Sequence, residues 1–436
     1  MRLIMDSFIS FFDGLSIFKN MYIQNTVTPV VLGMATSMAL CLLIVWTQRW
    51  HNALTSDYLN GAQKLHTTAT PRVGGAAIFL GLLIASSQAF DLVSPILDDV
   101  LIAGSPAFVF GFAEDLSGRI SVKWRYLATV VSGILFVWLL EHSLSLSLAP
   151  GLNWFMQLKG LSVLFTIVAI AGLTQSINII DGLNGQASLM SFFAFSGFAL
   201  IAYLVGDYAL SACCLILAAA VLGFFCVNWP FGKIFMGDGG AYFIGFALAA
   251  MAILLVERNY PVSDFAVLLI CVHPVTEVLF SMYRRAASGA SITQPDRLHF
   301  HTLLKMRYIR RWFGHWPNVA RNSIAGATMS LFSLLAVILA ALSYKNVILS
   351  AFFFVAMVAM YVTLYTRMAR FGWNKPKRSK MPRSHARSNA QRTGRHQPPA
   401  TSHQPPATSH QPPALTPPVQ GIRACARPNP FRLSAP

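Results

Sequence analysis

The sequence predicts an all-α integral membrane protein with about eleven transmembrane helices, an outside N-terminus and a cytoplasmic C-terminus. Hydrophobic residues make up 55% of the 436 positions and charged residues only 11%, which excludes an ordinary water-soluble domain. Apolar segments of about 20 residues, long enough to cross a bilayer, recur along the chain. They are expected at 28–47, 73–89, 95–113, 126–141, 161–178, 187–205, 209–227, 240–256, 264–282, 323–342 and 346–366.

The basic residues predict the orientation, because cytoplasmic loops of membrane proteins are enriched in Lys and Arg. When the first loop, 48–72, is placed in the cytoplasm, 28 of the 33 Lys and Arg residues fall on the cytoplasmic side. Without the segment after residue 366 the ratio is still 15 to 5. The N-terminus is therefore expected outside and the C-terminus inside.

The composition changes after residue 366, which divides the chain into a membrane domain, 1–366, and a cytoplasmic tail, 367–436. The tail holds 13 basic residues and repeats of HQPPATS, a Pro- and Ser-rich pattern typical of disorder. The net charge of +17 therefore indicates attraction to anionic membrane lipid rather than binding to nucleic acid. A tail without any function is the alternative.

Five short polar segments interrupt the apolar pattern, and the expected topology places all of them on the cytoplasmic side. They are TPRVGG (70–75), EDLSGRISVKWR (114–125), NIIDGLNG (178–185), FMGDGGAYFIG (235–245) and PDRLHFH (295–301). Any single acid among them is explained equally well as a helix cap. Together they predict a cavity for an anionic ligand, because glycines allow backbone N–H groups to approach such a ligand closely.

The side chains in these segments are suited to phosphate chemistry. Asp115, Asp181 and Asp238 offer the oxygen ligands that Mg²⁺ prefers, usually one or two carboxylates for each ion. Phosphates can be held by four basic residues, Arg72, Lys123, Arg125 and Arg297. The combination predicts metal-assisted phosphoryl transfer at the membrane surface.

In order and spacing, the five segments resemble those of the bacterial polyprenyl-phosphate N-acetylhexosamine-1-phosphate transferases of glycosyl transferase family 4. The resemblance covers roughly residues 28–366. It implies a multi-pass enzyme of the bacterial inner membrane with its active site on the cytoplasmic face. Its partners would be a UDP-N-acetylhexosamine, undecaprenyl phosphate and membrane lipid, and its cofactor Mg²⁺ or Mn²⁺. UMP would be released, and a homodimer is left open.

The resemblance also implies roles for the acidic segments. Asp238 would be the metal ligand, and Asp181 would support the metal and diphosphate region. Asn178 would fix the carboxylate of Asp181. Asp115, with Glu114 beside it, would orient or deprotonate the phosphate of the lipid acceptor, which Arg72, Lys123 and Arg125 would bind.

The resemblance also implies which residues bind the UDP-sugar donor. Gly182, Leu183 and Asn184 would contact the uracil, and Phe235 would stack on it. His299, His301 and Arg297 would contact the sugar and diphosphate, although an ordinary polar loop remains the alternative for the histidines. The chain departs from the common pattern at Glu114, Asn184 and Thr302, changes that concern the donor sugar more than the reaction.

Two alternatives stay open. One is a muramyl-pentapeptide type of transferase, and the other, from a different class, is a transporter, whose substrate site would lie near the bilayer midplane. Glu277, within the expected span 264–282, is a candidate functional carboxylate, and the alternatives are a local pair with Arg284 or an acid that snorkels to the membrane surface. His273 and Pro274 in the same span are expected to form a kink.

Overall fold

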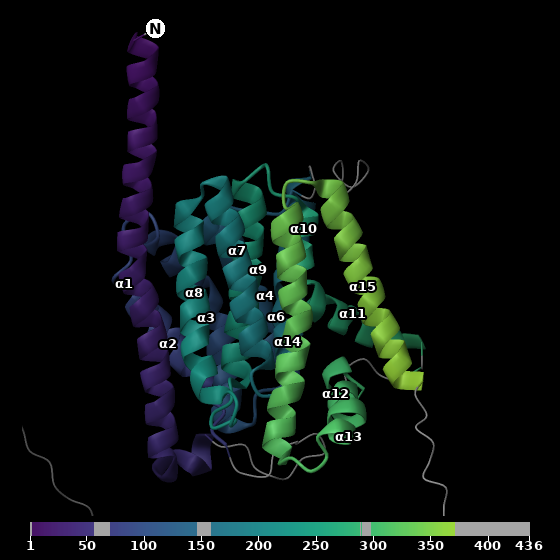
Figure 1. Cartoon of the computed structure of the whole chain (residues 1–436). Coiled ribbons are helices and arrows are strands. Elements are labelled where there is room, and N and C mark those ends of the chain that lie inside the picture. Colours follow the sequence, from purple (N-terminus) through teal and green to yellow (C-terminus); the bar gives the residue numbers. More distant parts are fainter. Residues whose placement is uncertain (1, 56–69, 146–157, 288, 290–297, 371–436) are drawn as a thin grey trace, which may run out of the picture. The chain divides into compact units, whose positions relative to one another are not determined.

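The computed structural model describes residues 2–55, 70–145, 158–287, 289 and 298–370 (Figure 1). Residues 1–371 form one compact unit. The tail beyond Arg370, with its repeats, lies outside the described residues, and so does Arg297. The described part is all-helical, as predicted, and consists of helices joined by loops.

The helices α1 to α9 cover the first two thirds of this unit. Their bounds are Arg2–Thr55 (α1), Gly74–Ser86 (α2), Ser94–Ser117 (α3), Val122–Leu140 (α4), Lys159–Ile180 (α6), Gln186–Val205 (α7), Tyr208–Asn228 (α8) and Gly237–Arg258 (α9). The remaining elements are Asp264–Ile270 (α10), Val272–Ala287 (α11), Phe300–Leu304 (α12), the π-helical turn Lys305–Ile309 (η1), Arg310–Trp312 (α13), Asn318–Ser343 (α14) and Val347–Arg370 (α15).

Each of the eleven expected apolar segments coincides with a helix or a helix pair, but not all of these can cross a membrane alone. In the described part of the chain, nine helices are long and apolar enough, or ten if the bent pair α10 and α11 counts as one span. The segment expected at 73–89 forms α2, which has only 13 residues and is shorter than the roughly 20 that a span requires. Instead, α2 packs against α1, α8 and α9.

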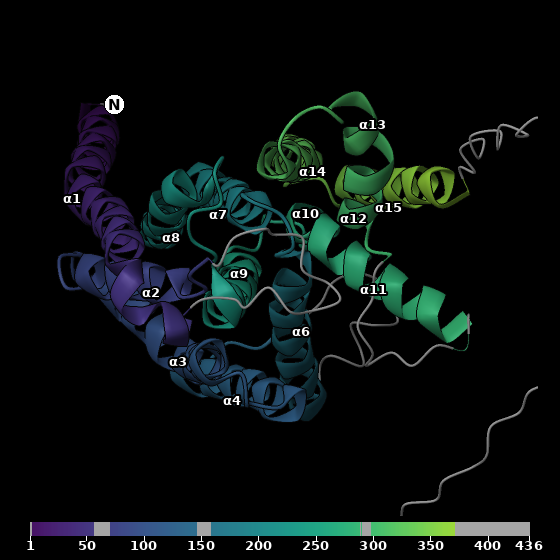
Figure 2. The ribbon, with the colours of Figure 1, turned by 90° about the horizontal axis from the view of Figure 1, so that it is seen from below.

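The expected continuous span 264–282 is broken at Cys271. The short α10 and the following α11 meet at an angle of 78°, and α11 extends sideways from the bundle (Figure 2). The kink expected at His273 and Pro274 is therefore present. Pro274 lies in the first turn of α11, where its missing N–H costs no hydrogen bond. The Nδ1 atom of His273 lies 3.0 Å from Ser333 Oγ on α14.

The core of the unit is α9, which lies among α3, α6, α7 and α8 (Figure 2). In an apolar 18-residue stretch of α9, 89% of the residues are buried. Small residues allow the neighbouring helices to approach it closely, as is common in membrane proteins. A Cβ added at Gly245 would lie 2.7 Å from the Cα of Thr174 on α6, and one added at Gly104 would lie 2.8 Å from the ring of Phe246. This packing fixes the position of the N-terminal end of α9.

Because α6 approaches Gly245 so closely, Gly245→Ala should force the two helices apart. Overpacking of this kind costs about 1–3 kcal/mol, so we expect a lower unfolding temperature of the detergent-purified chain. Gly172→Ala on α6 is the matched control, since a Cβ there meets nothing within 4 Å. Equal unfolding temperatures for the two variants would contradict the close α6–α9 contact.

Candidate active site

Side chains from four of the five polar segments meet where α3 and α6 end and where α4 and α9 begin. The fifth segment, with His299 and His301, contacts the loop of NIIDGLNG. The segment that leads into α2 is tied to the segment that leads into α9 by backbone hydrogen bonds. Phe235 N donates to Pro71 O (2.7 Å), and Gly74 N donates to Phe235 O (2.9 Å). This pairing brings Arg72 to the first turn of α9.

The carboxylate of Asp115, at the end of α3, binds the first turn of α9. Its two oxygens accept hydrogen bonds from the backbone N–H groups of Asp238 (2.8 Å) and Gly239 (2.9 Å). Backbone N–H groups in the first turn of a helix have no partner within the helix, and an anion there is favoured by the helix dipole. Asp115 thus acts as a cap supplied by another helix.

Glycines make this contact between α3 and α9 possible. A Cβ on Gly111 would lie 2.7 Å from the carbonyl group of Asp238, and one on Gly239 would lie 2.8 Å from the backbone N of Phe112. Gly237 has a φ of 76°, and a Cβ there would collide with the carbonyl oxygen of Arg72 and with Asp115. The glycines of FMGDGG are therefore needed by the close approach of three backbones.

Asp238 is surrounded by donors. Its carboxylate forms an ion pair with Arg125 at the start of α4, and Arg72 Nη2 lies 3.6 Å from its Oδ1 atom. The same Arg72 nitrogen lies 3.4 Å from Asp115 Oδ1. Asn178 Nδ2 donates to Asp238 Oδ1 at 3.1 Å. The expectation that Asn178 fixes the carboxylate of Asp181 was therefore wrong, because its amide reaches α9 instead.

Asp181 follows the last turn of α6 and lies in the same cluster, close enough for the charge of Arg72 to act on it. Burial raises the pKa of its carboxyl to about 7, and the positive charge of Arg72 opposes this rise. A carboxylate in such a position is stabilised by any further cation that approaches it.

Glu114 and Lys123 lie apart from the centre of the cluster. Glu114 Oε2 accepts a hydrogen bond from the backbone N of Ile120 at 2.6 Å, so its carboxylate closes the turn after α3 while that of Asp115 binds α9. Lys123 is exposed at the start of α4. The two neighbouring acids at 114 and 115 therefore have different partners.

The described residues contain no group of three His, Cys, Asp or Glu side chains arranged to hold a metal ion. Asp238 and Asp181 remain as a pair of carboxylates in one cluster. That number suits Mg²⁺, which usually takes one or two carboxylates and completes its shell with water and ligand phosphate. The donor set thus fits a magnesium ion that arrives together with a phosphate.

The histidine segment joins the cluster from the other side. The rings of His299 and His301 are stacked with centroids 5.5 Å apart. A Cβ on Gly182 would lie 2.6 Å from His301 Nε2, so the glycine of NIIDGLNG allows this imidazole to touch the loop. Burial lowers the pKa of His301 to about 4, which keeps its ring neutral at pH 7. Its Nδ1 atom is buried without a hydrogen-bond partner in the described part of the chain.

Glu277 holds this histidine segment in place, a role that the sequence did not reveal. Its Oε1 atom lies 2.9 Å from His299 Nδ1 and accepts the backbone N–H of Phe300 (3.2 Å). Its Oε2 atom accepts a hydrogen bond from Tyr361 on α15 (2.7 Å). Arg284, the alternative partner expected from the sequence, donates instead to the carbonyl oxygen of Leu298 (2.7 Å). An acid inside an apolar span was the only sequence signal for this role.

The residues expected to contact a uracil base differ in how far they are exposed. Gly182 lies at the cluster surface beside His301, and Phe235 is half-buried. Leu183 is buried against Ile309 and Ala325.

Asn184 is only 2% exposed. Its Nδ2 donates to Ser323 Oγ, and its Oδ1 accepts from Asn322 Nδ2, both at 3.1 Å. Its amide thus holds the loop against α14.

The part of the chain that contains the three acids is similar to known proteins. Residues 99–256 match the glycosyl transferase family 4 model, a range that includes Asp115, Asp181 and Asp238. In a separate comparison, the chain is 27% identical over 242 residues to a probable undecaprenyl-phosphate N-acetylglucosaminyl 1-phosphate transferase of Bacillus subtilis, and this match covers 55% of this chain and 66% of that protein.

Two further relatives are named undecaprenyl-phosphate alpha-N-acetylglucosaminyl 1-phosphate transferase. The protein of Escherichia coli (strain K12) is 26% identical over 249 residues, and that of Yersinia pestis is 28% identical over 250 residues. In both cases the match covers 56% of this chain and 67% of the relative, so it spans about two thirds of these proteins. The chain is thus similar to enzymes of glycosyl transferase family 4 over residues 99–256, about a third of its length, and to these transferases over slightly more than half of it.

Proposed function

We propose that the protein transfers N-acetylhexosamine 1-phosphate from a UDP-sugar to undecaprenyl phosphate. The observation that carries the proposal is the meeting of three carboxylates and two arginines at the ends of α3, α6 and α9. An oxygen of the lipid phosphate forms a bond to the β-phosphorus of the donor, and the bond from this phosphorus to the bridging oxygen breaks. UMP leaves with the bonding electrons.

Arg72 and Arg125 are proposed to bind the phosphates of the two substrates. In the structure both arginines are paired with carboxylates, and guanidinium groups bind phosphate with similar geometry. An incoming diphosphate would compete for the arginines and release the carboxylate of Asp238. Lys123, exposed beside them, adds positive charge for the lipid phosphate.

Asp238 and Asp181 are proposed to hold Mg²⁺, with Mn²⁺ as a substitute. The metal would neutralise the charge that develops on the diphosphate as the bond breaks. Asp115 already accepts two backbone hydrogen bonds, and these keep the first turn of α9 and Arg72 in register. We therefore assign to Asp115 the task of orienting the acceptor phosphate through Arg72, with Glu114 closing the adjacent turn.

His299 and His301 are proposed to contact the sugar and diphosphate, with Arg297 near them in sequence. A neutral imidazole at 301 serves as a hydrogen-bond donor or acceptor rather than as a charge. Gly182, Leu183, Asn184 and Phe235 are proposed to form the uridine pocket, where Asn178 also contributes through its hold on Asp238. Because Asn184 is buried against α14, this residue is proposed to hold the loop of the pocket in place.

The relatives' names favour UDP-N-acetylglucosamine as the donor. The product would begin a lipid-linked glycan of the cell envelope, such as an O-antigen or capsule. We place the enzyme in the bacterial inner membrane, with the site on the cytoplasmic face that the positive charges indicate. The site lies at helix ends rather than within the spans, which favours a surface enzyme over a transporter.

The reaction is tested by measuring UMP release from UDP-N-acetylglucosamine by the detergent-purified chain. We expect release that requires both undecaprenyl phosphate and Mg²⁺ and that stops with EDTA. Turnover with a different UDP-N-acetylhexosamine alone would change the donor and keep the mechanism. No UMP with any donor would refute the proposed transfer.

Asp238→Asn should reduce kcat by at least about a hundredfold, because the amide loses the charge that binds the metal. Asp207→Asn is the matched control, since Asp207 is also paired with an arginine, Arg258, but belongs to a separate ion pair at the start of α8. Near-normal turnover of Asp238→Asn across a Mg²⁺ titration would remove Asp238 from the metal site.

Glu277→Gln should lower kcat/KM for the UDP-sugar about tenfold, since a charged hydrogen bond to His299 is lost, while the KM for undecaprenyl phosphate stays unchanged. Glu257→Gln is the control, because Glu257 is also a carboxylate that accepts hydrogen bonds, from Ser145. The unfolding temperature is recorded for both variants. An equal loss for both substrates would show that Glu277 only supports the fold.

We propose that residues 1–366 form the catalytic domain and that residues 367–436, which differ from it in composition, form a separate tail. Deleting residues 376–436, beyond the end of α15 at Arg370, should leave kcat in detergent within about twofold of the full chain. Loss of turnover in a truncated chain of unchanged unfolding temperature would make the tail part of the enzyme.

A further inference from the structure

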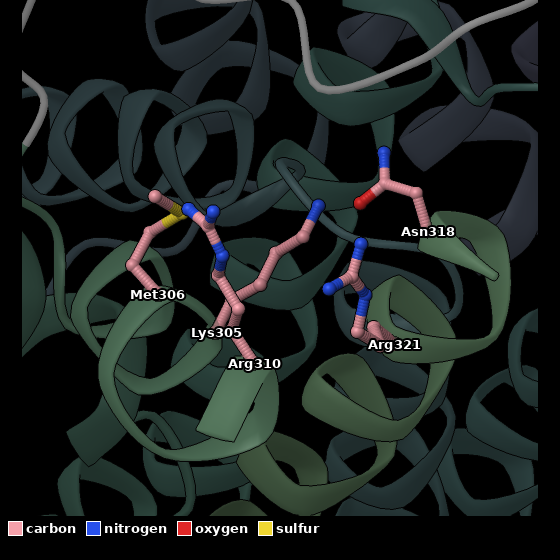
Figure 3. Close-up of a pocket in the computed structure, with 5 residues that line it drawn as sticks. All are labelled: Lys305, Met306, Arg310, Asn318 and Arg321. Atoms are coloured by element: carbon pink, nitrogen blue, oxygen red, sulfur yellow. The ribbon is translucent and has the colours of Figure 1, made fainter. Parts of the chain in front are cut away.

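A second basic site lies where η1 and α13 face the first turn of α14. It is a pocket of about 150 Å³ lined by Lys305, Met306, Arg310, Asn318 and Arg321. Figure 3 shows Lys305, Asn318 and Arg321 pointing toward one another, with Arg310 beside Lys305. Three of these side chains are cationic, and no described residue that lines the pocket is acidic.

Lys305 is buried, with 4% of its surface exposed. Its Nζ donates to Asn322 Oδ1 at 2.8 Å, a neutral partner, and among the described residues no carboxylate forms an ion pair with this ammonium group. Burial lowers the pKa of Lys305 to about 8, and the charge of Arg321 acts in the same direction. Buried cations are normally paired with an anion, so the second cation nearby makes this arrangement costly without a ligand.

Arg321 has unused donor capacity. Its Nε–H is buried and has no hydrogen-bond partner within the described residues. A planar guanidinium with free donors matches the oxygens of a phosphate group, and a lysine ammonium adds a point charge. Arg310 is exposed at the edge of the pocket, where its guanidinium can close over a bound group.

We infer that this pocket binds a phosphate group, held by Lys305, Arg310 and Arg321. Two or three cations match the charge of a phosphate dianion. The inference goes beyond the proposed transfer reaction, since none of these residues is assigned to either substrate of that reaction.

The pocket is connected to the loop of NIIDGLNG by hydrogen bonds. Lys305 bonds to Asn322, and Asn322 Nδ2 donates to Asn184 Oδ1. A bound phosphate that draws Lys305 toward itself would act on this loop through two hydrogen bonds. The phosphate could come from a soluble phosphate compound or from an anionic lipid headgroup. Met306, which lines the pocket, and Trp312, at the end of α13, are exposed and suit the membrane interface.

The test measures the unfolding temperature of the full chain in neutral detergent at pH 7 during a titration with inorganic phosphate. Sodium chloride of equal ionic strength serves as the reference. Phosphate should raise the unfolding temperature, because a ligand that binds only the folded state stabilises it. The phosphate concentration that gives half of this rise should be about tenfold higher for Arg310→Gln and for Arg321→Gln.

Arg311→Gln is the matched control, since Arg311 is the exposed neighbour of Arg310 and does not line the pocket. It should titrate like the unchanged chain. Absence of a phosphate-specific rise, or the same concentration for half of the rise in all four proteins, would overturn the inference. If Arg321→Gln does not fold, the comparison of Arg310→Gln with Arg311→Gln decides, because both arginines are exposed.

The source of the phosphate is identified by repeating the titration in phosphatidylcholine nanodiscs with and without phosphatidylglycerol. Loss of the phosphate response with phosphatidylglycerol would show that a lipid headgroup occupies the pocket, and a retained response would show a soluble phosphate. Both outcomes support the site. The measurement uses no UDP-sugar and no turnover, so its failure is separate from a failure of the transfer reaction.

Discussion

The site depends on the contact between the Asp115 carboxylate and the first turn of α9. A carboxylate that accepts two backbone N–H bonds fixes both the position of α3 along α9 and the direction in which the Asp238 side chain leaves the helix. Gly111, Gly237 and Gly239 are required by the same contact, because any side chain at these positions would separate the backbones. Arg72 then bridges the two acids, which joins the segment before α2 to the same centre.

The sequence predicted the all-helical class and the acids of the site, because both leave local signals. Apolar stretches mark the spans, and Asp181 and Asp238 are conspicuous beside glycines at the ends of such stretches. A kink at His273 and Pro274 was expected, but the 78° bend between α10 and α11 and the shortness of α2 were not apparent, since mean hydropathy does not distinguish a straight span from a bent or partial one. Tertiary packing, rather than composition, sets these lengths.

Hydrogen bonds between residues far apart in the sequence could not be predicted. Glu277 binds His299, 22 residues away, and Tyr361, 84 residues away, while its near neighbour Arg284 bonds elsewhere. Asn178 was paired with Asp181 because the two lie close along the chain, but its amide donates to Asp238, 60 residues away. Local spacing on a helix suggests neighbours, and only the packing of α6 against α9 decides between them.

The hydrogen bond from Tyr361 to Glu277 has a consequence for how the protein is made. Tyr361 belongs to α15, the last described helix, and Glu277 holds the segment that carries His299 and His301. A chain that enters the membrane from its N-terminus during synthesis therefore gains its acidic centre early, through α3, α6 and α9. The contact from Tyr361 to Glu277 forms only when α15 is inserted, so the position of the histidine segment is completed late.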